Sequence, residues 1–288
     1  MRRRPHSGSM QDSSIAVIGL GLIGSIWAAN YRRDGVLAAS WNRSEKPELE
    51  LLQGSLEDCA RQAELLQLCL YDAASVEAVL DQLEPFLEHR HTLIQSSTID
   101  PGSAARLAAR VRRAGARYVE APFTGSKPAA EARETVFFLG GEAEAIEAVE
   151  PTLARISQRR FVIGSPEQAA TIKLAMNLQI AAITEALCES LTMSRRAGID
   201  DEIFFSAMKK NVAWSGLAAL KEPKVREGEF SPQFSIKNMH KDMRLAEAAA
   251  GDLPILREVR ACLERCEEAG YGEDDFISLL RVLRNPAP

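Results

Sequence analysis

The stretch IAVIGLGLIG, residues 15–24, decides the fold. Its first four residues form a short apolar run, which is typical of a buried parallel strand, and the segment SIWAANYRRDG after the glycines favours a helix. In a strand–turn–helix unit, Gly19 permits a tight turn, Gly21 lets the backbone approach a pyrophosphate, and Gly24 lets the helix pack on the strand. The N–H groups at the start of the helix then face the phosphates. We therefore favour a dinucleotide-binding loop over an ordinary glycine-rich turn.

The segment after the second strand indicates which dinucleotide is bound. Leu37–Trp41 has the pattern of a strand and is followed by Asn42, Arg43 and Ser44, at the distance from the glycines where the ribose is recognised. An acidic residue there would bind the 2′-hydroxyl of NAD. Instead, the guanidinium of Arg43 and the hydroxyl of Ser44 can pair with a 2′-phosphate, so the sequence favours NADP over NAD. A plain surface turn remains the alternative for Ser44.

Further strands alternate with helical segments. They are expected at Leu65–Tyr71, Thr92–Gln95, Tyr118–Ala121, Thr135–Leu139 and Arg160–Ile163. Asp72 and the pair Asp100-Pro101 are typical of helix starts. This alternation predicts a doubly wound α/β sheet of the Rossmann type over residues 14–165. Ligands of such sheets bind at the carboxyl ends of the strands, where the segments GLGLIG, NRS, LYD, SST and FTGSK all fall.

A long helix begins the second half of the chain. Between Pro166 and Gly198 there is no glycine or proline, and ~1.5 Å per residue predicts a rod of roughly 45 Å. Most of its faces are apolar, yet Lys173 and Asn177 lie one turn apart on the same face. For a lysine alone, an exposed position is the commoner alternative to a buried, functional amine.

The remaining segments are helical, so we expect an all-α domain over residues 166–288, joined to the first domain through the long interdomain helix. Its further helices are expected at Asp201–Lys210, Gly216–Arg226, Met239–Ala250, Ile255–Ala269 and Asp275–Arg284.

The composition argues against several classes of protein. The 288 residues carry a formal net charge of −5, which argues against a nucleic-acid or membrane-surface partner. The five cysteines have no CxxC spacing, so we expect neither a metal site nor a disulfide framework. Free cysteines are typical of a reducing compartment, so we expect the protein to be cytoplasmic. Residues 1–13 are expected to form a disordered tail without a signal peptide. The long helix is too polar to span a membrane.

These motifs together resemble the β-hydroxyacid dehydrogenase family, over essentially Ser14 to the C-terminus. GLGLIG and the NRS segment resemble the cofactor loops of the NADPH-dependent members. The other matching positions are Ser97, Thr98, Pro101, Thr124, Gly125, Ser126, Gly164, Lys173, Asn177, Phe234, Lys237, Lys241, Asp242 and Leu245. The segment from Gly125 to Glu131 is most similar to the glyoxylate and succinic semialdehyde reductases. Thr124 and Arg133 depart from the family pattern, which leaves the substrate open.

The resemblance implies an oxidoreductase that transfers a hydride between NADP(H) and the carbonyl or hydroxyl group of a small anionic 2-oxo, semialdehyde or 3-hydroxy acid. Lys173 would act as general acid or base, with its pKa lowered by desolvation, and Asn177 would orient it. Thr124, Gly125, Ser126 and Lys241 would hold the substrate. The family also implies a homodimer or homotetramer.

The same resemblance implies a set of cofactor contacts at the ends of the strands. The residues expected to contact NADP are Gly19, Leu20, Gly21, Leu22, Ile23, Gly24, Asn42, Arg43, Ser44, Leu70, Tyr71, Asp72, Val76, Ser97, Thr98 and Lys241.

Three alternatives stay open at this point. An imine reductase shares this architecture, although those enzymes usually carry another residue where Lys173 stands. Arg133 and Lys127 near the predicted anion loop would suit a phosphonate or sulfonate hydroxy acid. A non-catalytic NADP-binding interaction module is the third alternative, and retention of Lys173 speaks against it.

Overall fold

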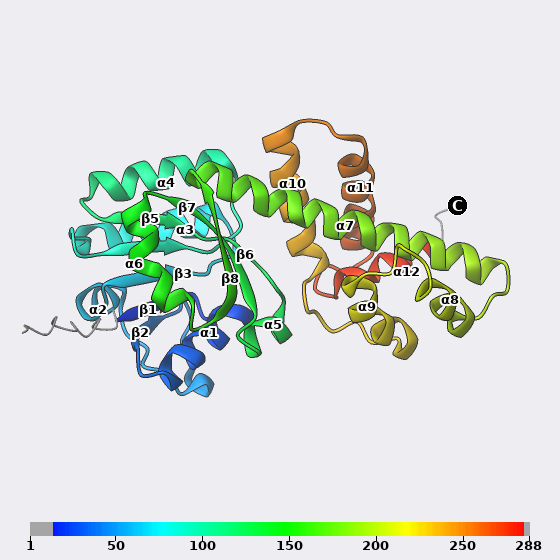
Figure 1. The fold of residues 1–288 in the computed structure, drawn as a ribbon, viewed down its shortest axis with the longest axis horizontal. Helices are drawn as coiled ribbons and strands as arrows, with labels where there is room; N and C mark the ends of the chain where they lie inside the picture. Colours follow the sequence, from blue (N-terminus) through cyan, green and yellow to red (C-terminus); the bar gives the residue numbers. More distant parts are fainter. Residues whose placement is uncertain (1–13, 285–288) are drawn as a thin grey trace, which may run out of the picture. The chain divides into compact units, whose positions relative to one another are not determined.

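The computed structural model describes residues 14–284, so the tail predicted for residues 1–13 lies outside the described residues. The chain divides into two units (Figure 1). The first contains Met1–Ser97 and Gly102–Ala170, and the second contains Thr98–Pro101 and Thr171–Pro288. The short segment 98–101, which follows a strand of the first unit, is therefore part of the second.

The first unit is built on one eight-stranded sheet. Its strands are β1 (Ile15–Ile18), β2 (Leu37–Trp41), β3 (Leu65–Leu68), β4 (Thr92–Gln95), β5 (Arg117–Glu120), β6 (Phe123–Thr124), β7 (Thr135–Gly141) and β8 (Ser157–Gly164). The order is β2-β1-β3-β4-β5-β7-β6, and β8 also pairs with β7. The first five strands run parallel, whereas β7 is antiparallel to β5 and β6. The predicted doubly wound α/β sheet is thus confirmed, with an antiparallel addition.

The register of the parallel strands aligns their carboxyl ends. Ile18 is paired with both Trp41 and Leu68, Leu68 with Gln95, and Gln95 with Glu120. Each of these residues is the last of its strand, so β1 to β5 all end along one edge of the sheet. The loops that the sequence singled out begin at this edge.

Helices cover both faces of this sheet. They are α1 (Leu22–Arg33), α2 (Leu56–Gln62), α3 (Ala73–Leu83), α4 (Pro101–Arg113), α5 (Lys127–Glu131) and α6 (Ala143–Leu153), with 3₁₀ turns at Pro47–Leu49 and Glu84–Phe86. Trp27 of α1 and Val149 of α6 share a buried cluster with Ile15 and Val17 of β1, so α1 and α6 pack on the same face. Ile18 points to the other face and is fully buried too, because successive strand residues alternate. Helix α2 packs against β1 and β2.

The second unit is helical, as predicted. Its elements are α7 (Pro166–Arg196, which begins in the first unit), α8 (Asp201–Met208), α9 (Gly216–Glu227), α10 (Ile236–Ala250), α11 (Pro254–Glu268), the 3₁₀ turn η3 (Phe276–Ser278) and α12 (Leu279–Arg284). One core joins them, with Leu187 of α7, Phe205 of α8, Met243 of α10 and Leu263 of α11 among its buried members. Within residues 14–284, no helix combines the length and the apolar character that crossing a membrane requires.

The structure corrects several element bounds. The strand predicted over Leu65–Tyr71 ends at Leu68, because the Leu70 N–H is bonded to a side chain, the Ser97 hydroxyl, instead of a neighbouring strand. Strand β6 was not predicted, since two residues are too few to give a pattern. Helix α10 starts three residues before the predicted Met239, because the Ser235 hydroxyl caps it by accepting from the Asn238 N–H.

A buried ion pair connects distant parts of the second unit. The side chains of Lys221 on α9 and Asp275 before η3 are 1% and 0% exposed, and the Lys221 Nζ lies 2.7 and 2.9 Å from the two carboxylate oxygens. The same ammonium donates to Gln233 and lies 4.4 Å from the centre of the Phe276 ring. Asp275 also accepts from the backbone N–H groups of Gln233 and Ile277. The pair therefore joins α9, the segment before α10 and η3.

Replacing Lys221 by methionine should lower the free energy of unfolding by about 3–5 kcal/mol, because it leaves the buried Asp275 carboxylate without its cation. Urea unfolding followed by circular dichroism measures this. Lys237→Met is the matched control, since Lys237 and its partner Glu273 are exposed, and it should cost less than about 1 kcal/mol. Equal losses in the two variants would show that the buried pair has no special role in stability.

Candidate active site

The glycine loop between β1 and α1 has the shape that a dinucleotide needs. A Cβ at Gly19 would lie 2.3 Å from the Cys69 carbonyl oxygen, and a Cβ at Gly24 would lie 2.0 Å from the Gly19 carbonyl oxygen. Only glycine therefore fits at these two positions. At Gly21 a Cβ would meet nothing within 4 Å. Within the described residues, no side chain caps the start of α1. The loop thus offers backbone N–H groups and free space to a phosphate, and it fits the pyrophosphate of NAD(P).

Asn42 holds this loop in place. Its Oδ1 accepts from the Leu20 N–H at 2.9 Å, and its Nδ2 donates to the Ser44 carbonyl at 2.7 Å. The side chain predicted to meet the ribose is therefore engaged in joining the end of β2 to the glycine loop. Arg43 and Ser44, which follow it, are exposed. They are the two residues of this segment whose side chains face solvent.

The ends of β3 and β4 are also linked by a side chain. The Leu70 N–H donates to the Ser97 hydroxyl oxygen at 2.8 Å. Asp72 caps α3 by accepting from the Ser75 N–H at 2.8 Å, and Tyr71 between them is 46% exposed. Val76 was expected to contact the cofactor, but its side chain is 0% exposed, because it packs in the core below α3 and presents no surface here.

The predicted anion loop follows β5. Thr124, Gly125 and Ser126 are all partly exposed, and Gly125 has φ +112°, which favours glycine. Lys127 lies 3.8 Å from Glu131, one turn further along α5. The loop offers two hydroxyl groups and the backbone N–H groups between them.

The suggestion that Arg133 serves this loop is wrong. Its guanidinium makes two hydrogen bonds to the Asp34 carboxylate, at 2.7 and 2.9 Å, and a third to the Arg155 carbonyl. Asp34 ends α1, so Arg133 ties the end of that helix to the turn after α5. Three acceptors already occupy the guanidinium, and the pairing lowers the pKa of Asp34, chiefly through the hydrogen bond from Arg133.

Lys173 lies in a polar cluster inside the second unit. Its Nζ donates to the Asn177 Oδ1 at 2.9 Å, and the Asn177 Nδ2 donates to the Asp242 Oδ2 at 2.6 Å. Lys241 lies 3.1 Å from the other Asp242 oxygen and donates to the Thr98 carbonyl, also at 3.1 Å. Lys173, Asn177 and Asp242 are 8%, 2% and 1% exposed. The exposed alternative for Lys173 is therefore wrong.

The surroundings of Lys173 lower its pKa to about 8. Burial is the main cause, since it penalises the charged ammonium; the Asp242 carboxylate opposes this effect, and the Lys241 ammonium adds to it. An amine with this pKa changes its charge close to neutral pH. It can therefore give or take a proton, which an exposed lysine does far less readily.

The predicted site residues fall into two groups, one in each unit. The cofactor loops and the Thr124–Ser126 segment belong to the first unit, whereas Lys173, Asn177, Lys241 and Thr98 belong to the second. The contact of Asp242 with Asn177 was not visible in the sequence, because 65 residues separate the two.

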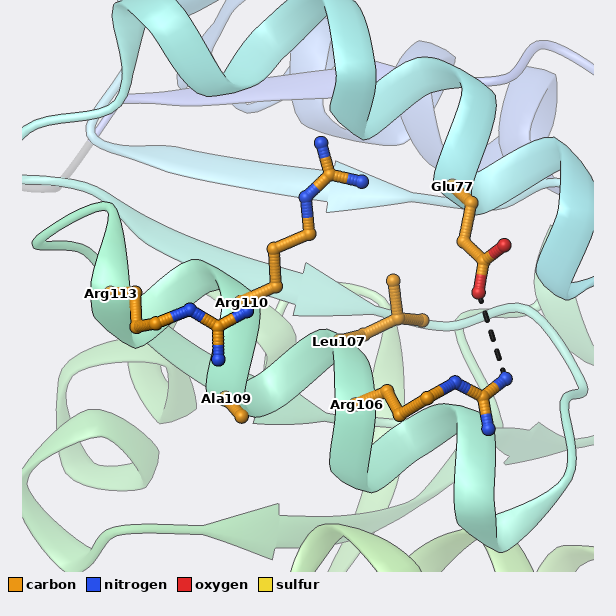
Figure 2. A pocket seen from close by; sticks show the side chains of 6 residues that line it. All are labelled: Glu77, Arg106, Leu107, Ala109, Arg110 and Arg113. Carbon is orange, nitrogen blue, oxygen red and sulfur yellow. Dashed lines mark ion pairs between the residues drawn. The ribbon is translucent and has the colours of Figure 1, made fainter.

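A separate pocket of about 320 Å³ lies between α3 and α4 (Figure 2). It is lined by Glu77, Arg106, Leu107, Ala109, Arg110 and Arg113. Figure 2 shows Arg106 paired with Glu77, at 3.7 Å, and Arg110 is paired with Asp81 and Glu84. Acidic partners thus compensate much of the positive charge of the pocket. None of the predicted site residues lines this pocket.

Two family models match most of the chain. Residues 14–164 match the model for the NAD-binding domain of 6-phosphogluconate dehydrogenase, and residues 168–283 match the NAD-binding region of NADP-dependent 3-hydroxyisobutyrate dehydrogenase. Glyoxylate/succinic semialdehyde reductase 1 of Arabidopsis thaliana is 24% identical over 284 residues, covering 94% of this chain and 98% of the relative.

Solved structures share the fold. The 3-hydroxyisobutyrate dehydrogenase of Salmonella typhimurium superposes with a TM-score of 0.84 at 22% identity, covering 94% of this chain and all of that one. Psf3, solved in complex with NADP+ and 2-OPP, gives a TM-score of 0.85 at 22% identity, over 93% of this chain and 99% of its own. With both family models matched along its length, the chain belongs to the β-hydroxyacid dehydrogenase family of NAD(P)-dependent oxidoreductases.

Proposed function

We propose that this protein is an NADPH-dependent reductase of a small carbonyl acid, working reversibly as a hydroxyacid dehydrogenase, with Lys173 as its general acid and base. The observation that carries the proposal is the environment of Lys173: a buried amine that donates to the Asn177 amide, and whose pKa is lowered to about 8. Such an amine suits a reaction in which an oxygen gains or loses a proton.

The nicotinamide supplies or accepts the hydride, and the chain supplies the proton. As the carbonyl carbon of the substrate is reduced, its oxygen gains charge, and Lys173 protonates that oxygen; in the reverse direction it removes the proton. Asn177 keeps the amine in place. Because the Asn177 nitrogen faces the Asp242 carboxylate, its oxygen must face Lys173.

NADPH as the preferred cofactor is supported by Arg43 and Ser44. Both are exposed at the end of β2, next to the glycine loop, and no carboxylate occupies the segment Asn42–Ser44 to repel a phosphate. A guanidinium and a hydroxyl together can make charge-assisted hydrogen bonds to a 2′-phosphate. Psf3, a structural neighbour, was solved with NADP+.

A small carboxylate is the substrate class that the chain supports best. The hydroxyls of Thr124 and Ser126 and the intervening backbone N–H groups can cradle an anionic head group. Arg133, the cation that would favour a phosphonate or sulfonate, is paired with Asp34. The name of the Arabidopsis relative points to glyoxylate and succinic semialdehyde as the first compounds to try. Retention of Lys173 favours carbonyl reduction over imine reduction.

The first test follows NADPH absorbance with glyoxylate, succinic semialdehyde, other oxoacids and cyclic imines. We expect turnover with at least one small oxoacid or semialdehyde, and Lys173→Ala should lower kcat roughly 10²–10⁴-fold while NADPH still binds. Lys224→Ala is the matched control, because it removes another buried ammonium of the second unit and should keep kcat. NADPH binding without turnover of any of these compounds would refute the reductase proposal.

Arg43→Ala should lower kcat/KM for NADPH roughly 10- to 100-fold, since a charge-assisted pair contributes about 1.5–3 kcal/mol, and should leave kcat/KM for NADH nearly unchanged. Steady-state kinetics with the two cofactors measures the ratio. The exposed Arg61→Ala, on α2, controls for the lost positive charge. A wild-type protein that uses NADH as well as NADPH would contradict the assignment of Arg43.

The rate of reduction should fall as the pH rises through about 8, because Lys173 must be protonated to act as an acid. Asp242→Asn removes the nearby carboxylate that favours the charged ammonium, so this fall should begin at lower pH. The asparagine oxygen can still accept from Asn177, which preserves the geometry. Glu267→Gln, whose partner is His240, is the control and should leave the pH profile unchanged. An unshifted profile in Asp242→Asn would argue that another group supplies the proton.

A further inference from the structure

A buried polar network lies at the carboxyl edge of the sheet, within the first unit. Gln95 ends β4 and Glu120 ends β5, and the two are register partners on adjacent strands. The Gln95 Nε2 donates to one Glu120 oxygen at 2.9 Å, and the Tyr118 hydroxyl donates to the other at 2.5 Å. Gln95 and Glu120 are 0% exposed and Tyr118 is 1% exposed. Burying a carboxylate here is unfavourable unless both oxygens are bonded, as they are.

This carboxylate determines which way the Gln95 amide points. Both Glu120 oxygens accept, so the amide nitrogen of Gln95, and not its oxygen, must face Glu120. Tyr118 remains a donor, because burial and the Glu120 charge raise the pKa of its hydroxyl well above 10. The Gln95 oxygen is therefore turned away from Glu120 and toward the loop that follows β4.

The oriented Gln95 amide makes two hydrogen bonds to the backbone of Ser97. The Gln95 Oε1 accepts from the Ser97 N–H at 2.6 Å, and its Nε2 donates to the Ser97 carbonyl at 2.9 Å. Ser97 is 3% exposed, and its hydroxyl oxygen accepts from the Leu70 N–H. A continuous chain of hydrogen bonds thus runs from β5, through β4, to the loop after β3. It fixes two of the loops proposed to contact the cofactor.

We propose that Gln95 and Glu120 are positioning residues for the nicotinamide cofactor: they preset the loops at Ser97 and at Leu70–Asp72, so that the cofactor binds without first having to order them. The inference rests on the proposed NADPH-dependent function and adds two residues that touch neither cofactor nor substrate. The physical reason is that a loop ordered before binding loses less conformational entropy when its ligand arrives.

His91, at the other end of β4, provides a matched control. His91 immediately precedes β4, at the end opposite to Gln95, and it is also 0% exposed with both ring nitrogens engaged, by the Glu88 N–H and the Ala60 carbonyl. His91 bonds to segments at the amino end of β4, away from the loops at the carboxyl edge. Replacing it disturbs a comparable buried polar group next to the amino end of β4 without touching the loops at the carboxyl edge.

The experiment compares Gln95→Leu, Glu120→Gln and His91→Leu in the full chain. The dissociation constant for NADPH is measured by fluorescence titration well below each melting temperature, beside kcat and KM. Gln95→Leu and Glu120→Gln should weaken NADPH binding roughly 3- to 10-fold, the equivalent of one lost hydrogen bond, and lower kcat as well. His91→Leu should lower the melting temperature and leave both the dissociation constant and kcat near the wild-type values.

Normal NADPH affinity and kcat in Gln95→Leu, with a lowered melting temperature only, would overturn the proposal and make the network a stabilising element. If Gln95→Leu does not fold, Tyr118→Phe tests the same chain more gently: it removes one bond to Glu120 and should give a smaller loss of affinity, and unchanged affinity would count against the proposal. A wild-type protein that binds no NADP(H) would instead refute the proposed function on which this inference rests.

Discussion

The common register of the parallel strands is the constraint on which the first unit depends. Ile18, Trp41, Leu68, Gln95 and Glu120 are paired neighbour to neighbour and are each the last residue of a strand. Loops that are far apart in the chain must therefore start at one edge. Side chains at that edge can therefore make hydrogen bonds to a neighbouring loop. Asn42 bonds to Leu20 in this way, and Ser97 bonds to Leu70.

Two of the buried lysines of the second unit, Lys173 and Lys221, have different hydrogen-bond partners. Lys221 is bonded to both oxygens of the Asp275 carboxylate, which opposes the lowering of its pKa by burial. Lys173 is bonded to a neutral amide, and burial lowers its pKa to about 8. Burial lowers the pKa of both amines, but the ammonium of Lys221 is in direct contact with a carboxylate and joins three segments of the fold, whereas Lys173 donates to an amide that Asp242 orients.

Much of the fold was predictable because its signals are local. The glycine spacing, the apolar run Ile15–Ile18, and the absence of glycine and proline between Pro166 and Gly198 each act within a few turns of chain. Strand direction is not encoded in such patterns, so the antiparallel β7 was not foreseen. Partners remote in sequence were missed for the same reason. Arg133 looked available for an anion until its pairing with Asp34, 99 residues away, was seen.

The sequence by itself determined the class of fold and the helical second unit, because spacing along a helix or strand depends on neighbouring residues only; the proposed role of Lys173 came from the resemblance of its motif to the family. The tertiary structure alone decided that Lys173 is buried, that Asp242 orients Asn177, and that Glu120 orients Gln95. Desolvation and the direction of a hydrogen bond depend on every group that surrounds an atom, and those groups come from segments that only folding brings together.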